Sequence, residues 1–242
     1  MEFSHNRATT YDKLFWAKDE GYLEAIVKVA NFKKDDLVLD VGTGTGIVAR
    51  KIKPLVKEMF ALDISNEMLK HGKWEGISVI NWDIRHTLFA PETFDKITAR
   101  MVFHHITTDL EQAIKHCHTA LKKNSTLIVA EGVPPSDDPE TLDWYTDMFK
   151  LKEDRITFTE NDLVKRLRDN GFEEVTVRRY ITRGFSISNW LVNSGINSET
   201  KDSIMNLHHT AAEYIKQAYN MRFTGDDCII DTTNLILVAR KC

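Results

Sequence analysis

The chain has 242 residues, 42% of them hydrophobic, and a formal net charge of −4. A chain of this length can bury one full core, and no apolar run approaches the roughly 20 residues that a membrane-crossing helix needs. The chain has no basic block, which argues against a nucleic-acid partner, and its first residues lack the apolar centre of a secretory signal.

The first predicted elements surround a glycine-rich loop. A helix ending near Asn31 precedes the run Leu37–Val41, which is short and apolar, as a strand buried on both faces must be. Three glycines at alternate positions and a helical pattern over residues 47–52 follow. Such glycines allow a sharp turn and a close approach of the backbone to a ligand. The dinucleotide fingerprint needs its third glycine where this chain has Ile47. The three glycines are Gly42, Gly44 and Gly46.

Acidic residues follow consecutive predicted strands. Asp40 stands ahead of the glycine loop, where its charge would repel a pyrophosphate and favour a cationic ligand. The next apolar run ends in Asp63, and an acid at the tip of that neighbouring strand can accept hydrogen bonds from ribose hydroxyls. Ser65 then offers a helix N-cap. A third run leads to Asp83, and a fourth covers Phe94–Arg100.

The second half of the chain continues the alternation of strands and helices. Thr108–Glu111 has the pattern of a capping box and predicts a helix to about Leu121. Gly171 suits the left-handed position past a helix end. The other expected elements are a strand at 126–130, a helix at 161–169 and strands at 172–181 and 228–240. This alternation predicts an α/β fold with a doubly wound, mostly parallel sheet.

Two segments exceed what such a core requires. Residues 133–159 contain a loop and a helix that Asp138 would cap, and residues 184–224 separate the last two strands. A connection of roughly forty residues is long enough to suggest a lid over the carboxyl ends of the strands. We expect one long helix there, from about Glu199 to Met221. For any single aromatic residue, packing of the added helices is the simpler interpretation.

The glycine loop and the acids resemble the motifs of the class I S-adenosylmethionine-dependent methyltransferases, and the resemblance covers nearly the whole chain. It implies a single domain over residues 1–242 and a seven-stranded sheet whose last strand is antiparallel. It also implies that Asp83 faces the adenine amino group, that Ile84 packs on the ring, and that Tyr11 reaches the methionine carboxylate. The implied contacts to S-adenosyl-L-methionine are Tyr11, Asp40, Gly42, Gly44, Gly46, Asp63, Ile64, Met68, Asp83, Ile84 and Arg100.

Two neighbouring histidines are the candidate catalytic residues. His104 and His105 follow the fourth strand, on the rim where the methyl group should point, and histidine has an unperturbed pKa of about 6.5. One of them could instead satisfy backbone groups at the start of the next helix. His208 and His209 are weaker candidates on an exposed helix face. Arg155 or Arg183 could bind an anionic acceptor, although a solvated surface position is expected for each.

Three functions are compatible with this pattern. The resemblance favours a methyltransferase for a small organic metabolite, in the branch that includes the ubiquinone and menaquinone C-methyltransferases. A methyltransferase acting on RNA or protein is the second; residues 100–103 lack the Asn- or Asp-Pro-Pro-aromatic motif of base-amino methylation. The third is a cofactor-binding protein with changed chemistry. Cys117, Cys228 and Cys242 show no metal-ligand spacing, so we expect a reduced, cytoplasmic setting without a metal. A homo-oligomer is compatible with the sequence.

Overall fold

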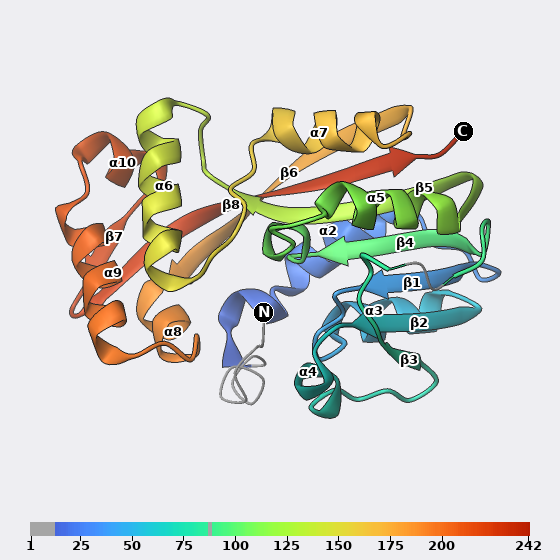
Figure 1. Cartoon of the computed structure of the whole chain (residues 1–242). Helices are drawn as coiled ribbons and strands as arrows, with labels where there is room; N and C mark the ends of the chain where they lie inside the picture. The colour runs from blue at the N-terminus through green and yellow to red at the C-terminus, as the bar shows by residue number, and fades with distance from the viewer. Residues whose placement is uncertain (1–12, 87–88) are drawn as a thin grey trace.

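A single mixed β-sheet runs through the protein (Figure 1). The computed structural model describes residues 13–86 and 89–242, so Tyr11 lies outside the described residues. Within them, eight strands form the sheet in the order β3-β2-β1-β4-β5-β8-β6, and β7 pairs with β8. The strands are β1 (Leu37–Val41), β2 (Glu58–Asp63), β3 (Ser78–Asn81), β4 (Phe94–Arg100), β5 (Leu121–Val133), β6 (Glu174–Ser186), β7 (Arg222–Thr224) and β8 (Asp227–Arg240).

The strand directions confirm the predicted mostly parallel sheet with an antiparallel last strand. Strands β1 to β5 pair with one another in parallel, and β8 runs antiparallel to both β5 and β6. The sheet has one strand more than the seven expected, because the short β7 forms a hairpin with β8. Gly225 in the hairpin turn has a φ of 58°, a backbone conformation that glycine adopts without strain.

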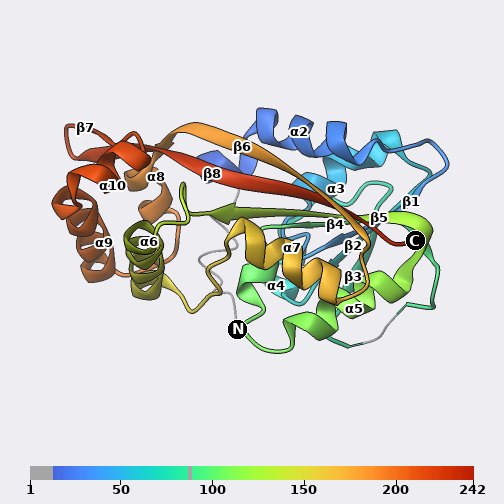
Figure 2. The ribbon, with the colours of Figure 1, turned by 90° about the horizontal axis from the view of Figure 1, so that it is seen from above.

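Helices cover both faces of the sheet (Figure 2). The side chains of β1 alternate between these faces: Val38 packs in the cluster that includes α3, and Leu39 packs in the cluster that includes α5 and α7. The helices are η2 (Phe15–Lys18), α2 (Glu20–Ala30), α3 (Ile47–Ile52), η3 (Lys53–Leu55), α4 (Asn66–Lys70), η4 (Phe103–His105), α5 (Leu110–Ala120), α6 (Pro139–Lys152), α7 (Glu160–Asp169), α8 (Ile187–Val192), α9 (Ser198–Thr210) and α10 (Glu213–Ala218). No helix in the described ranges is long and apolar enough to cross a membrane.

The two extra segments meet at one end of the sheet. The β5–β8 pairing ends at Val133 and Thr233, whereas β6 and β8 stay paired as far as Ser186 and Ile229. This two-stranded extension carries α8, α9 and α10, and α6 lies beside them (Figure 1). Their apolar side chains form a second core, separate from the clusters that pack on the parallel strands. Its members include Tyr145, Met148, Trp190, Ile204, Ile215 and Tyr219.

Two local predictions were wrong. The expected long helix over 199–221 is broken into α9 and α10, because Ala211 and Ala212 are extended, with ψ angles of 142° and 153°. The break allows Ala211 and Ile215 to be buried in the second core, so packing overrides the high helix propensity of alanine. The capping box at Thr108 does not form, because α5 begins at Leu110 and its N-cap is Asp109. The Thr108 hydroxyl accepts a hydrogen bond from Arg85.

Other helix ends match the sequence. Ser65 caps α4, Asp138 caps α6 with Pro139 behind it, and Gly171 has a φ of 97°. A capping box that the sequence analysis did not identify begins α7, where Thr159 and Asp162 exchange hydrogen bonds. These caps satisfy backbone N–H groups that a helix leaves without partners at its first turn.

Candidate active site

A cavity of about 370 Å³ lies at the carboxyl ends of the parallel strands and extends to the second core. Its wall includes the loop after β1, the ends of β2 and β5, and side chains from α6, α8 and α9. Ligands in open α/β sheets bind at this edge of the sheet. Five of the residues expected to contact a cofactor line this cavity together with Gly42 and Gly44: Asp63, Ile64, Met68, Asp83 and Ile84.

The glycine loop has the backbone conformation that its sequence predicts. Gly42, Gly44 and Gly46 have φ angles of 64°, 60° and 83°, which side-chain-bearing residues rarely adopt. A Cβ atom on Gly42 would overlap Val102. Gly46 precedes α3 and lies outside the cavity wall. A Cβ atom on Gly46 would overlap the Trp74 ring, so this glycine is required by packing as well as by its backbone conformation.

Asp40 lies behind the glycine loop, outside the cavity wall. Its carboxylate is 1% exposed and accepts hydrogen bonds from the hydroxyls of Thr43, at 2.7 Å, and Thr98, at 2.6 Å. Burial raises the pKa of Asp40 to about 6. The carboxylate therefore connects the glycine loop to β4. Asp40 was expected to contact the cofactor, and in the structure it holds the glycine loop in position.

Asp63 ends β2 and faces the cavity. Its two carboxylate oxygens accept N–H groups from Gly44 and Ser65, each at 2.8 Å. Burial is the main reason that the pKa of Asp63 is raised. A carboxylate oxygen can accept more than one hydrogen bond, so Asp63 can also accept hydrogen bonds from a ligand.

Asp83 and Arg100 are both held by neighbouring groups. Arg85 binds the Asp83 carboxylate through Nε, at 3.1 and 3.0 Å, and through Nη2, at 2.7 Å. Arg100 is buried outside the cavity wall, where its Nη1 donates to the Ala17 carbonyl and its guanidinium lies 5.0 Å from the Tyr22 ring centre. Arg100 thus supports the wall at Tyr22, a cavity-lining residue.

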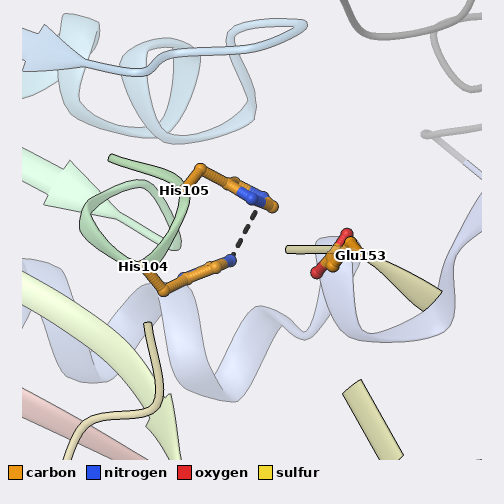
Figure 3. A group of neighbouring side chains, drawn as sticks. All are labelled: His104, His105 and Glu153. Atoms are coloured by element: carbon orange, nitrogen blue, oxygen red, sulfur yellow. Dashed lines mark hydrogen bonds between the residues drawn. The ribbon is translucent and has the colours of Figure 1, made fainter. Parts of the chain in front are cut away.

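The candidate histidines form a hydrogen-bonded chain with a buried acid. Nδ1 of His104 lies 2.6 Å from Oε2 of Glu131. Nε2 of His104 lies 3.1 Å from Nε2 of His105 (Figure 3). Glu131 is fully buried, and its Oε1 accepts the N–H groups of Val102 and Phe103. Burial raises the pKa of Glu131 to about 7.

Glu131 is the functional candidate that the sequence analysis missed. It stands in β5 within the apolar run 127–133. A carboxylate inside such a run is costly to bury without partners, and this was the available signal. The partner was not visible because His104 comes from a different strand end.

A cluster of three charged side chains, Lys152, Glu153 and Arg155, lies opposite the histidines at the end of α6. Nζ of Lys152 lies 2.6 Å from Oε2 of Glu153, and Nη1 of Arg155 lies 3.8 Å from Oε1 of the same carboxylate. The ligand atoms of His104, His105 and Glu153 lie within 4.8 Å of one another (Figure 3), a spacing that could hold a metal ion.

One of the two predicted surface arginines is buried. Arg155 was expected at the surface, but its side chain is 6% exposed and lines the cavity, because it packs on the Phe149 ring. Arg183 is 79% exposed, as expected.

The prediction that His208 lies on an exposed helix face was wrong. It is buried with 0% exposure against Trp144, and burial lowers its pKa to about 4. Its Nδ1 bonds to the carbonyl of Ile204 at 2.8 Å. His209 is exposed, as expected, and stacks on Phe223.

Comparison with known proteins identifies the family. The methyltransferase domain family matches residues 15–177, so the chain belongs to that family. A curated relative, the uncharacterized methyltransferase YcgJ of Bacillus subtilis, is 26% identical over 56% of this chain and 55% of its own length. Demethylmenaquinone methyltransferase of Thermotoga maritima is 28% identical over 51% of this chain and 55% of its own length. The chain thus spans about half the length of these relatives.

Solved structures show the fold. The crystal structure of YcgJ has a TM-score of 0.79 at 17% identity and covers 92% of this chain and 99% of its own. Phosphoethanolamine N-methyltransferase 2 of Haemonchus contortus, in complex with S-adenosyl-L-methionine, has a TM-score of 0.62 at 15% identity and covers 92% of this chain and 53% of its own. A shorter match, 40% identical, joins 23% of this chain to 20% of ribosomal RNA small subunit methyltransferase A of Crocosphaera subtropica.

Proposed function

We propose that this member of the methyltransferase domain family transfers the methyl group of S-adenosylmethionine to a small organic acceptor. The observation that carries the proposal is a single cavity that joins the glycine loop and Asp63 to His104, His105 and the aromatic side chains of α6 and α8. A concave, largely apolar site with a few polar groups is typical of small-molecule binding.

The cofactor would occupy the half of the cavity formed by the parallel strands. Asp63 would accept hydrogen bonds from the ribose hydroxyls, and the backbone at Gly44 would approach the ligand closely. Asp83 and Ile84 would contact the adenine, as expected from the sequence. A contact of Tyr11 with the cofactor remains a prediction from the sequence. Asp40 and Arg100, expected as contacts, would instead act through the glycine loop and the Tyr22 wall that they hold.

The acceptor would lie between the histidines and the second core. In methyl transfer, an acceptor lone pair attacks the methyl carbon, and the carbon–sulfur bonding pair stays with sulfur, giving S-adenosylhomocysteine. The protein's main contribution is alignment, with the reacting atoms held about 3 Å apart. Where the acceptor must lose a proton, His104 or His105 would take it. When Nδ1 of His104 donates its proton to Glu131, the lone pair of the ring is on Nε2, which lies 3.1 Å from Nε2 of His105. A proton from the acceptor would be taken up at this Nε2 in place of the hydrogen bond to His105.

We also propose a lid role for residues 133–159 and 184–224, because their side chains close the acceptor half of the cavity. The quinone-type acceptor, the cytoplasmic location, the single-domain organisation and a homo-oligomer remain predictions from the sequence. An RNA or protein acceptor is the second candidate, and the ribosomal RNA methyltransferase match is the observation that favours it.

The test is acceptor-dependent formation of S-adenosylhomocysteine by the purified protein. We expect turnover with the ultrafiltrate of a cell extract. Turnover only with the retained macromolecules, lost after ribonuclease or protease treatment, would replace the small acceptor with RNA or protein. Cofactor binding without turnover on either fraction would indicate a binding protein with changed chemistry.

A further inference from the structure

We propose that the methyl acceptor carries a carboxylate group and that Arg155 binds it. This inference rests on the proposed function, because it names the substrate class of the same site. Arg155 lines the cavity, and its side chain is 6% exposed. Its Nε and Nη2 atoms are buried and have no hydrogen-bond partner among residues 13–86 and 89–242.

Two unpartnered N–H groups on a buried guanidinium are unfavourable. Buried polar groups are almost always hydrogen-bonded, and leaving a charged donor unsatisfied costs more than leaving a neutral one. Nε and Nη2 form one edge of the planar guanidinium, which matches the two oxygens of a carboxylate. The chain itself uses this edge elsewhere: Arg85 holds Asp83 through Nε and Nη2 at 2.7 to 3.1 Å.

The position of Arg155 is fixed by its apolar contacts. The guanidinium carbon lies 4.1 Å from the Phe149 ring centre and 5.8 Å from that of Tyr145. Planar cations stack favourably on aromatic faces. The guanidinium is therefore held in place beside the cavity before any ligand arrives, which lowers the entropic cost of binding.

The charges around Arg155 favour an anion over a metal ion. Within the described part of the chain, Nζ of Lys152 and Nη1 of Arg155 both approach the carboxylate of Glu153. Arg155 also acts to lower the pKa of Glu131, but the oxygens of Glu131 already accept hydrogen bonds from His104 and two backbone N–H groups. A metal ion at the histidines would add positive charge, whereas a carboxylate would offset the charge of Arg155.

Arg155 also lies near the proposed catalytic histidines, so a ligand carboxylate bound there would lie near the reacting group. Glu153 lies within 4.8 Å of the histidine ligand atoms, and Arg155 adjoins Glu153 on the side away from the ion pair with Lys152. An acceptor held by Arg155 would thus have its reacting group within reach of His104 and His105. Arg155 would be a specificity-determining residue.

The experiment compares carboxylic acids with their neutral amides. The probes are benzoate and benzamide, phenylacetate and phenylacetamide, and indole-3-acetate and indole-3-acetamide. Binding is measured by calorimetry on the full chain saturated with S-adenosylhomocysteine. We expect at least one acid to bind at least about tenfold more tightly than its amide, as a charge-assisted hydrogen-bond pair should produce. Three acids that bind no better than their amides would overturn the proposal.

Variants assign the preference to a residue. Arg155→Gln should abolish the preference for the acid, and Arg155→Lys should keep only part of it, because lysine retains the charge without the fork. Arg183→Gln, at an exposed arginine, is the matched control and should behave like the wild type. An acid preference that survives in Arg155→Gln would overturn the assignment.

Two further arms separate the alternatives. Phenyl phosphate that binds more tightly than every acid, in an Arg155-dependent way, would replace the carboxylate with a phosphate. Acid binding that appears only with added Zn²⁺ would place a metal at the histidines instead. Binding of S-adenosylhomocysteine is measured first, in a separate titration of the ligand-free chain. Its failure would contradict the proposed function, whereas its success without acid preference would contradict this inference alone.

Discussion

The carboxylate of Asp40 is an example of a buried acid whose charge has a cost. Two threonine hydroxyls donate to it, yet burial outweighs them and raises its pKa from 3.8 to about 6. The folded state therefore binds a proton more tightly than the unfolded state does. Stability from this group increases as the pH falls from about 6 to about 4.

The substitution Asp40→Asn tests this sign. Asparagine keeps the shape and can still hydrogen-bond both threonines, but it cannot ionise. The free energy of unfolding of the wild type, relative to that of Asp40→Asn, should rise by on the order of 3 kcal/mol between pH 7 and pH 4. Urea titrations at several pH values measure the difference. A difference that stays constant, or grows as the pH rises, would contradict the account of Asp40.

His104 and Glu131 should act together in turnover. In Glu131→Gln, the side-chain amide would donate an N–H to Nδ1 of His104. The ring proton would then be on Nε2, the nitrogen proposed as the base. We expect Glu131→Gln and His104→Gln each to lower the rate at saturating cofactor by about a hundredfold or more, with little change in S-adenosylhomocysteine affinity. His209→Gln, on the exposed face of α9, is the control. Normal rates in both site variants would make the histidine chain structural.

At the scale of elements, the loop between β1 and α3 depends on more than left-handed backbone angles. Gly42 has a φ of 64° and is packed against Val102, whereas Gly225 has a φ of 58° and nothing within 4 Å of an added Cβ. The two glycines share the backbone requirement and differ in the space around them, so they form a matched pair.

Alanine at each position separates the two effects. Gly225→Ala should cost about 1 to 2 kcal/mol, the strain of a left-handed residue, and leave cofactor binding unchanged. Gly42→Ala should be more destabilising because of overpacking. It should also weaken the binding of S-adenosylhomocysteine at least about tenfold. Thermal unfolding with and without the ligand measures both quantities. Equal effects of the two substitutions would show that the close approach of Val102 has no influence on the site.

At the scale of the whole molecule, the central strands were predictable and the second core was not. Strands β1 and β4 have the predicted bounds. β1 is a short, mostly apolar run, as a strand buried on both faces should be. The carboxyl-end positions of Asp63 and Asp83 follow from that order of strands.

The acceptor half of the cavity depends on contacts between distant segments. Arg155 and His208 were expected at the surface, since charged or polar residues on helices are mostly solvated. His208 is buried because α6 and α9, which lie far apart in the sequence, pack together and place Trp144 against it. Arg155 is buried on the rings of Phe149 and Tyr145. The link between His104 and Glu131 likewise joins the ends of two strands. Local sequence patterns carry no information on such pairings.

The most direct test of the central claim is a calorimetric titration of S-adenosylmethionine into the wild type, Asp63→Asn and Asp226→Asn. We expect the wild type to bind the cofactor and Asp63→Asn to bind it at least about tenfold more weakly. Asp226→Asn, at an exposed turn position, should bind it like the wild type. A wild type that does not bind the cofactor, or an Asp63→Asn variant that binds it equally well, would contradict the account.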